Sequence, residues 1–76
     1  MARAYLKIWV KSGSEDGVRD GLLAIAGVKS ADLTAGEQDL IAVVEADSYE
    51  DVLQIVLGQV RTIKGVERTV TNLAVG

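Results

Sequence analysis

The chain has 76 residues, of which 49% are hydrophobic and 25% are charged, and its formal net charge is −3. It contains no histidine and no cysteine, which removes the usual ligands of zinc, haem, copper and iron–sulfur sites and excludes nucleophilic catalysis by Cys-His or Ser-His-Asp groups. With eight Lys and Arg residues against eleven Asp and Glu residues, the chain has no excess of positive charge for binding nucleic acid.

Residues 1–76 are enough for one domain and too few for two. A core of this size, without a disulfide or a metal, predicts self-association as an additional source of stability. We expect no metal and no cofactor. The apolar stretches are short and interrupted, and the first residues lead into a strand-like pattern rather than an apolar leader. We therefore expect a cytoplasmic protein without a membrane-spanning segment.

The first predicted strand covers Ala2–Val10, where the side chains alternate between two faces. One set is aliphatic and suits a core covered by helices. The other set includes Tyr5, Lys7 and Trp9, on the face that would otherwise meet solvent. Because large aromatic rings are costly to leave exposed there, we expect these three residues to lie in an interface with a partner sheet.

Two helices are predicted, each with a serine at its N-cap, Ser14 for the first and Ser48 for the second. Both carry one apolar stripe at helical spacing. The second helix also has Leu53 and Leu57 on a side that one sheet cannot cover, so we expect both leucines in an interface. Each helix is predicted to end in the same pattern, Ile-x-Gly-Val, and Gly27 is expected to take a left-handed conformation at the end of the first.

Residues 28–34, 39–46 and 66–75 are the remaining predicted strands. The order of elements is therefore β-α-β-β-α-β, which consists of two split βαβ units in tandem. This order predicts an α+β fold, a ferredoxin-like sandwich of the dimeric α/β-barrel type with two helices on one face of a four-stranded antiparallel sheet.

The connector between the second and third strands, residues 34–39, has the composition of a binding turn. Gly36 can take a positive φ and leave backbone N–H groups free for an anion such as a carboxylate, and Asp39 can receive an ammonium group. A turn that offers both suits an α-amino acid. The alternative is an ordinary hairpin connector in which Asp39 accepts hydrogen bonds from backbone amides, and the residues alone leave both interpretations open.

Two further groups of polar residues lie near the end of the chain. Thr69 and Thr71 share one side of the last strand, where their hydroxyls either line a polar pocket or reflect only the β-propensity of threonine. The cations Arg61, Lys64 and Arg68 suit the C-terminus of the second helix and a solvated face, and they are too few to indicate nucleic-acid binding.

Taken together, these segments resemble the ligand-binding domain, or RAM domain, of the Lrp/AsnC (leucine-responsive and asparagine regulator) family. The resemblance rests on AYLKIWV at 4–10 followed by Lys-Ser-Gly, on the helix ending Ile-Ala-Gly-Val, on AGEQDLIAVVEA at 35–46 and on Gly-Val-x-x-Thr-x-Thr at 65–71. It covers nearly the whole chain.

This resemblance implies a protomer that pairs through its sheet and assembles into rings of dimers, such as octamers or decamers, with an amino-acid effector bound at the interfaces between dimers. Gly36 and Asp39 match the family motif, whereas position 38 varies in the family. The ligand-binding candidates that it implies are Thr34, Gly36, Gln38, Asp39, Thr69 and Thr71. Full regulators carry a helix-turn-helix domain ahead of this one, so the chain resembles the stand-alone form. We expect it not to bind DNA directly, and co-assembly with full-length relatives is one hypothesis for a regulatory role.

The expected function is thus that of a non-enzymatic, oligomeric amino-acid-binding effector module in transcription regulation. One alternative is a purely structural or co-assembly role with no ligand. A second is a small enzyme of the dimeric α/β-barrel type, which is disfavoured because the chain lacks a histidine to act as acid or base near neutral pH. A third is the ACT domain, a related amino-acid-binding family with the same order of elements and a ligand site at a helix–strand boundary.

Overall fold

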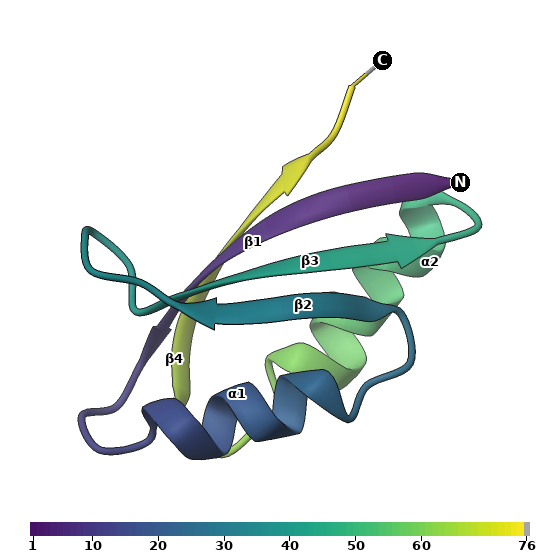
Figure 1. Cartoon of the computed structure of the whole chain (residues 1–76). Coiled ribbons are helices and arrows are strands. Elements are labelled where there is room, and N and C mark those ends of the chain that lie inside the picture. The colour runs from purple at the N-terminus through teal and green to yellow at the C-terminus, as the bar shows by residue number, and fades with distance from the viewer. Residues whose placement is uncertain (76) are drawn as a thin grey trace.

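The computed structural model describes residues 1–75. Its elements are β1 (Ala2–Val10), α1 (Glu15–Leu23), β2 (Val28–Leu33), β3 (Leu40–Ala46), α2 (Tyr49–Ile55), the π-helical turn η1 (Val56–Val60) and β4 (Val66–Leu73). The strands pair antiparallel in the order β2-β3-β1-β4, and both helices lie on one face of the sheet (Figure 1). The predicted ferredoxin-like β-α-β-β-α-β sandwich is therefore confirmed.

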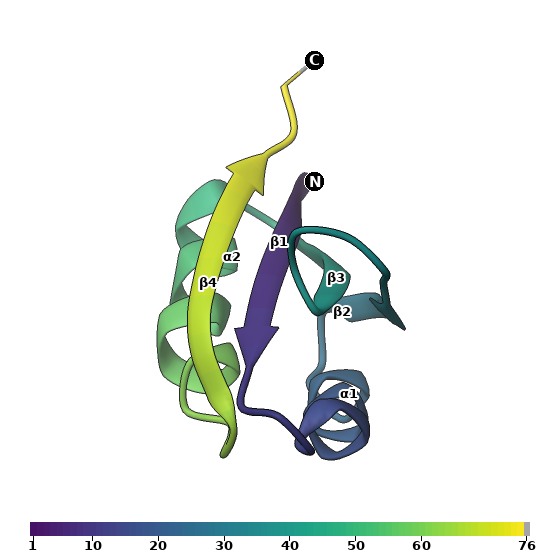
Figure 2. The same cartoon turned by 90° about the vertical axis from the view of Figure 1, so that its left-hand side faces the viewer.

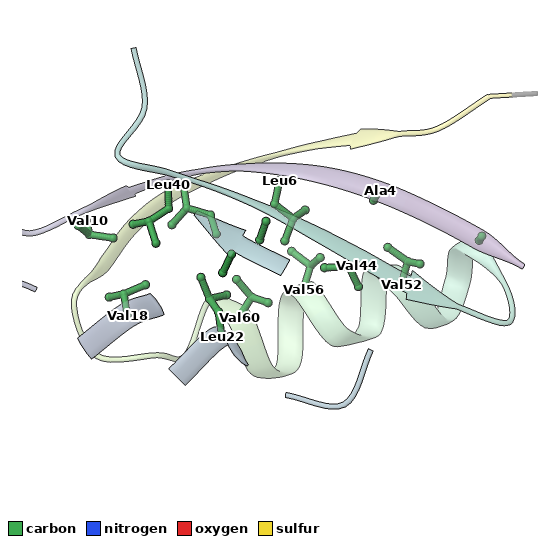
Figure 3. Close-up of a cluster of buried hydrophobic side chains, with 14 residues drawn as sticks. Ala4, Leu6, Val10, Val18, Leu22, Leu40, Val44, Val52, Val56 and Val60 are labelled. Atoms are coloured by element: carbon green, nitrogen blue, oxygen red, sulfur yellow. The ribbon is translucent and has the colours of Figure 1, made fainter. Parts of the chain in front are cut away.

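The core lies between the sheet and the two helices (Figure 3). The central strand β1 contributes every second residue to it, as its alternating pattern predicted. From the helices come Val18 and Leu22 of α1 and the stripe Val52, Val56 and Val60 of the second helical segment. None of the helices in residues 1–75 is long and apolar enough to cross a membrane.

Both helices begin directly after the serines that were predicted as their N-caps, but their ends differ from the prediction. Ser48 Oγ accepts a hydrogen bond from the Asp51 N–H at 3.1 Å, whereas the side chain of Ser14 makes no capping hydrogen bond. The first helix ends at Leu23, two residues before Ile25, which begins the Ile-x-Gly-Val pattern predicted to end it. The second continues beyond α2 as the wider turn η1, in which the Arg61 N–H donates to the Val56 carbonyl at 2.9 Å.

The two Ile-x-Gly-Val corners adopt matching geometry. Gly27 has a φ of +100° and Gly65 a φ of +102°, which confirms the left-handed conformation expected of Gly27, although α1 has already ended four residues earlier. In both corners the valine N–H donates to the isoleucine carbonyl at 3.1 Å, and the glycine carbonyl accepts a backbone N–H at 2.8 Å from a distant segment. The corners thus fix the start of β2 against β3 and the start of β4 against the end of β1.

The register of the sheet determines which residues share its helix-free face. Tyr5 lies opposite Val43 of β3, and Lys7 lies between Ile41 and Val70 of its two neighbours. The helix-free face therefore carries Tyr5, Lys7 and Trp9 together with alternate residues of β3, as the pattern predicted. Viewed from the side of β4, the start of β1 and the end of β4 lie at the same end of the sheet (Figure 2).

Candidate functional site

The connector, residues 34–39, is closed by hydrogen bonds between its own ends. The Thr34 N–H donates to the Asp39 carbonyl at 3.0 Å, and Thr34 Oγ1 donates to the Gln38 carbonyl at 3.0 Å. The side-chain amide of Gln38 in turn donates to Thr34 Oγ1 at 3.1 Å. Thr34, Gln38 and Asp39 are thus brought together, and Thr34 and Gln38 hold the shape of the connector.

Asp39 ties the connector to the central strand. Its carboxylate oxygen Oδ2 accepts the Val10 N–H at 2.8 Å, and its own N–H donates to the Ile8 carbonyl at 3.0 Å. The alternative prediction, that Asp39 accepts hydrogen bonds from backbone amides, therefore holds for one of its two carboxylate oxygens. Within residues 1–75 no hydrogen bond engages the other oxygen, Oδ1, so Asp39 retains an acceptor for a cationic donor.

Gly36 does not take the positive φ that we expected of it. Among residues 1–75, the glycines with positive φ are Gly13, Gly27 and Gly65. The physical reason is that the connector reverses direction through successive bends, so no single residue needs a left-handed conformation. A Cβ added at Gly36 would meet only Gln38 Nε2, at 3.8 Å. Nothing within the described chain therefore demands a glycine at this position.

Glu37 links the connector to the helix-free face, and the sequence reasoning missed this link. Its backbone carbonyl accepts the Trp9 indole N–H at 3.0 Å, and its carboxylate lies 3.5 Å from Lys7 Nζ. The pattern of the sequence placed Trp9 and Lys7 on one face but not beside Glu37. Only the pairing of β1 with β3 brings the connector over that face.

Thr69 and Thr71 do not join the connector within one protomer. Thr69 pairs with Ile8 and Thr71 with Leu6, so both threonines lie on the helix-covered side of the edge strand β4. Strand β1 stands between them and the connector. The six candidates therefore form two groups in the protomer, four in the connector and two on β4.

At the opposite end of β1 the helix-free face carries an ion pair. Arg3 Nη2 and Nε lie 2.7 and 2.8 Å from Glu45 Oε2. Hydrogen bonds to the Tyr5 side chain and to the Glu45 carboxylate raise the pKa of Arg3, because both stabilise the charged guanidinium. Arg3 is exposed, so the pair contributes little to stability.

A stripe of exposed apolar residues runs along α2 and η1. Leu53 is 41% exposed and Leu57 57% exposed, as expected of residues that one sheet cannot cover. Tyr49 extends the stripe by one further turn, and its hydroxyl donates to the Ala74 carbonyl at 2.6 Å. Tyr49 was not predicted as part of this stripe, although its spacing of four residues from Leu53 indicates it.

Hollows on the surface of residues 1–75 include the following three. Two of them, of about 260 and 270 Å³, lie around Met1 and Tyr49, and the third, of about 440 Å³, lies where β4 begins. None of these three has a connector residue in its wall. Within the connector, residues 35–37 are exposed and Thr34, Gln38 and Asp39 are partly buried.

Comparison with known proteins identifies the family. The family model for the Lrp/AsnC ligand-binding domain matches residues 3–76. An uncharacterized HTH-type transcriptional regulator of Pyrococcus horikoshii, PH1916, is 41% identical over 57 residues, which are 75% of this chain and 38% of the regulator. The chain thus spans well under half the length of that curated relative.

Solved structures agree with the family match. The protein FFRP-DM1 superposes with a TM-score of 0.93 at 33% identity, over 99% of this chain and 100% of that chain. The transcriptional regulator NMB0573 from Neisseria meningitidis, solved as a complex with L-Met, superposes with a TM-score of 0.89 at 13% identity, over 99% of this chain and 50% of that chain. The second likeness concerns the fold alone. From the match over residues 3–76, this chain belongs to the Lrp/AsnC ligand-binding domain family.

Proposed function

We propose that the chain is a non-enzymatic, oligomeric effector module of the Lrp/AsnC transcription-regulator type that binds a small amino acid at the interfaces between its dimers. The family description as a ligand-binding domain supports the module, and the names of the curated relatives support the regulatory context. The L-Met bound to NMB0573 supports an amino acid as the ligand class.

The observation that carries this proposal is the open backbone at Gly36. Its neighbours in the chain leave room for a side chain, since an added Cβ would meet one amide nitrogen at ordinary contact distance. A glycine that its own chain does not require is explained when a ligand or a second subunit approaches the backbone closely. In this proposal the N–H groups around Gly36 hold the ligand carboxylate.

Asp39 receives the ammonium group in the same proposal. Its Oδ2 is held by the Val10 N–H at 2.8 Å, which fixes the carboxylate in place and leaves Oδ1 for the ligand. A charge-assisted hydrogen bond from an ammonium to a positioned carboxylate is stronger than one between neutral groups. Thr34 and Gln38 keep the connector in shape around the two binding groups.

The remaining candidates require a second subunit. Thr69 and Thr71 are separated from the connector of their own protomer by β1, so we assign them to the ligand side chain across a subunit boundary. Tyr5, Lys7 and Trp9 form the contact between paired sheets, and Leu53 and Leu57 form a second contact between dimers. The exposure of these leucines supports the second contact.

The test is isothermal titration calorimetry of the purified protein with each of the twenty amino acids, followed by Asp39→Asn. Asparagine keeps an oxygen for the Val10 N–H and removes the charge, so we expect the fold to persist and the affinity for the amino acid to fall at least about tenfold. Asp47→Asn removes an exposed carboxylate outside the connector and serves as the matched control. Unchanged affinity in Asp39→Asn would defeat the assignment.

A further inference from the structure

The hollow where β4 begins contains three charged residues that the proposed function does not use. It has a volume of about 440 Å³ and is lined by Arg61, Val66, Glu67, Arg68 and Thr69. Apart from the half-buried Val66, every lining side chain is polar or charged. Two of the three cations that the sequence assigned to a solvated helix end thus face one hollow.

The end of η1 and the start of β4 bring these residues together. Arg61 follows directly after η1, at its C-cap. Arg68 pairs with Trp9 and so lies toward the helix-free side, whereas Thr69 pairs with Ile8 and lies toward the helices. The register between β1 and β4 shifts next to Trp9, as in a β-bulge. The hollow therefore wraps around the free edge of β4.

One of the two guanidinium groups is held in place by an aromatic ring. Arg68 Cζ lies 4.5 Å from the centroid of the Trp9 ring, a distance at which the ring face attracts the cation. Stacking leaves the edges of the guanidinium free to donate hydrogen bonds. Arg68, which lines the hollow, is thus held against Trp9 by a contact that does not use its N–H groups.

Neither guanidinium forms an ion pair within residues 1–75. Within residues 1–75 the ion pairs are Arg3 with Glu45, Lys7 with Glu37 and Arg19 with Asp16, so Arg61 and Arg68 both lack an acidic partner. Glu67 lines the same hollow, and no ion pair within residues 1–75 joins it to either arginine. On a chain of net charge −3, this hollow is a local concentration of unpaired positive charge.

We propose that this hollow binds a phosphate group, either free or carried by a small metabolite. A carboxylate has two oxygens and a single negative charge, whereas a phosphate presents more oxygens and more charge and so binds a pair of guanidinium groups more strongly. The volume exceeds that of a bare phosphate and falls in the range of small-molecule sites. No connector residue lines the hollow, and Thr69 is the one lining residue that it shares with the proposed amino-acid site.

The test is calorimetric titration of the full chain with inorganic phosphate, ribose 5-phosphate, ribose and acetate at constant ionic strength. We expect both phosphate compounds to bind, and ribose and acetate not to bind. Tighter binding of ribose 5-phosphate identifies a phosphoester as the ligand, and equal binding identifies the phosphate alone. Trp9, the only tryptophan in the chain, provides a second readout, because a ligand on Arg68 alters the environment of the ring beneath it.

Substitutions distinguish a specific phosphate site from a general attraction of anions to positive charge. One guanidinium group is removed by each of the substitutions Arg61→Gln and Arg68→Gln. We expect each to weaken phosphate binding at least about tenfold. Lys64→Gln removes the same charge from a nearby exposed residue outside the wall of the hollow, so affinity should change less than about twofold, as expected for a solvated charge. Glu67→Gln should strengthen binding, because it removes the opposing carboxylate.

Three results would overturn the proposal. One is an absence of phosphate binding by the folded protein, with folding checked by circular dichroism. Another is an equal loss of affinity in Lys64→Gln and the two arginine variants, which would indicate attraction by net charge alone. The third is acetate binding as tight as phosphate binding. Asp39→Asn should leave phosphate affinity unchanged, so this proposal and the amino-acid site can fail separately.

Discussion

Gly65 is required both by its backbone conformation and by its neighbours. Its φ is +102°, and an added Cβ would lie 2.7 Å from Ser14 Cβ. A left-handed conformation costs an L-residue about 1–2 kcal/mol, and the overlap adds to this cost. We predict that Gly65→Ala lowers the free energy of unfolding by at least about 2 kcal/mol, measured by urea denaturation.

Gly17 provides the matched control in α1. Its φ is not positive, and nothing lies within 4 Å of an added Cβ. Because alanine is the better helix former, Gly17→Ala should raise the free energy of unfolding by about 0.5–1 kcal/mol. Equal stabilities of Gly65→Ala and the unmodified chain would contradict the role of this corner.

Asp39 has a structural role that can be separated from its proposed role in ligand binding. Asp39→Ala leaves the N–H of the buried Val10 without its acceptor, which costs about 1–3 kcal/mol. Asp39→Asn keeps an acceptor there, so we predict that it unfolds at a higher urea concentration than Asp39→Ala. Identical denaturation midpoints would show that the bond to Val10 does not hold the connector.

At the scale of elements, the hydrophobic periodicity and the turn residues of the sequence predicted most of the helices and strands. Alternation in β1 predicted its two faces, and the repeated Ile-x-Gly-Val predicted two corners whose hydrogen bonds match. The π-helical turn η1 was not predictable from the sequence pattern. The four-residue spacing of Val52, Val56 and Val60 fits an α-helix and a π-helix alike. The placing of Glu37 beside Trp9, and of Thr69 away from Asp39, required the strand register, which single-strand patterns do not contain.

The apolar stripe on α2 and η1 permits a test of the proposed contact between dimers. Leu57 is 57% exposed in the protomer, so Leu57→Lys should change the free energy of unfolding of the protomer by less than about 0.5 kcal/mol. A lysine in an apolar contact is costly to desolvate, and we predict that assemblies larger than a dimer are lost in sedimentation velocity.

Gln59→Lys adds the same charge to the same turn at an exposed polar position and should leave the assembly intact. Loss of the larger assembly in both variants, or in neither, would contradict a role for the stripe. A dimer that persists in Leu57→Lys would in turn support the helix-free face as the first contact.

For the whole molecule, the sequence was sufficient to predict the fold and the two faces with exposed apolar residues, because both follow from local pattern. It could not predict a complete ligand site. The connector and the β4 threonines stay apart in one protomer, so any site that uses both groups is formed by the assembly. The identity of the ligand depends on the fit between subunits, which the residues of one chain do not specify.

Native mass spectrometry of the purified chain, alone and with a pool of the twenty amino acids, tests the central proposal most directly. The account predicts a ring of dimers that retains one kind of amino acid, with the added mass identifying it and with no retention by Asp39→Asn. A monomer, or a ring that stays bare in the presence of every amino acid, would contradict it.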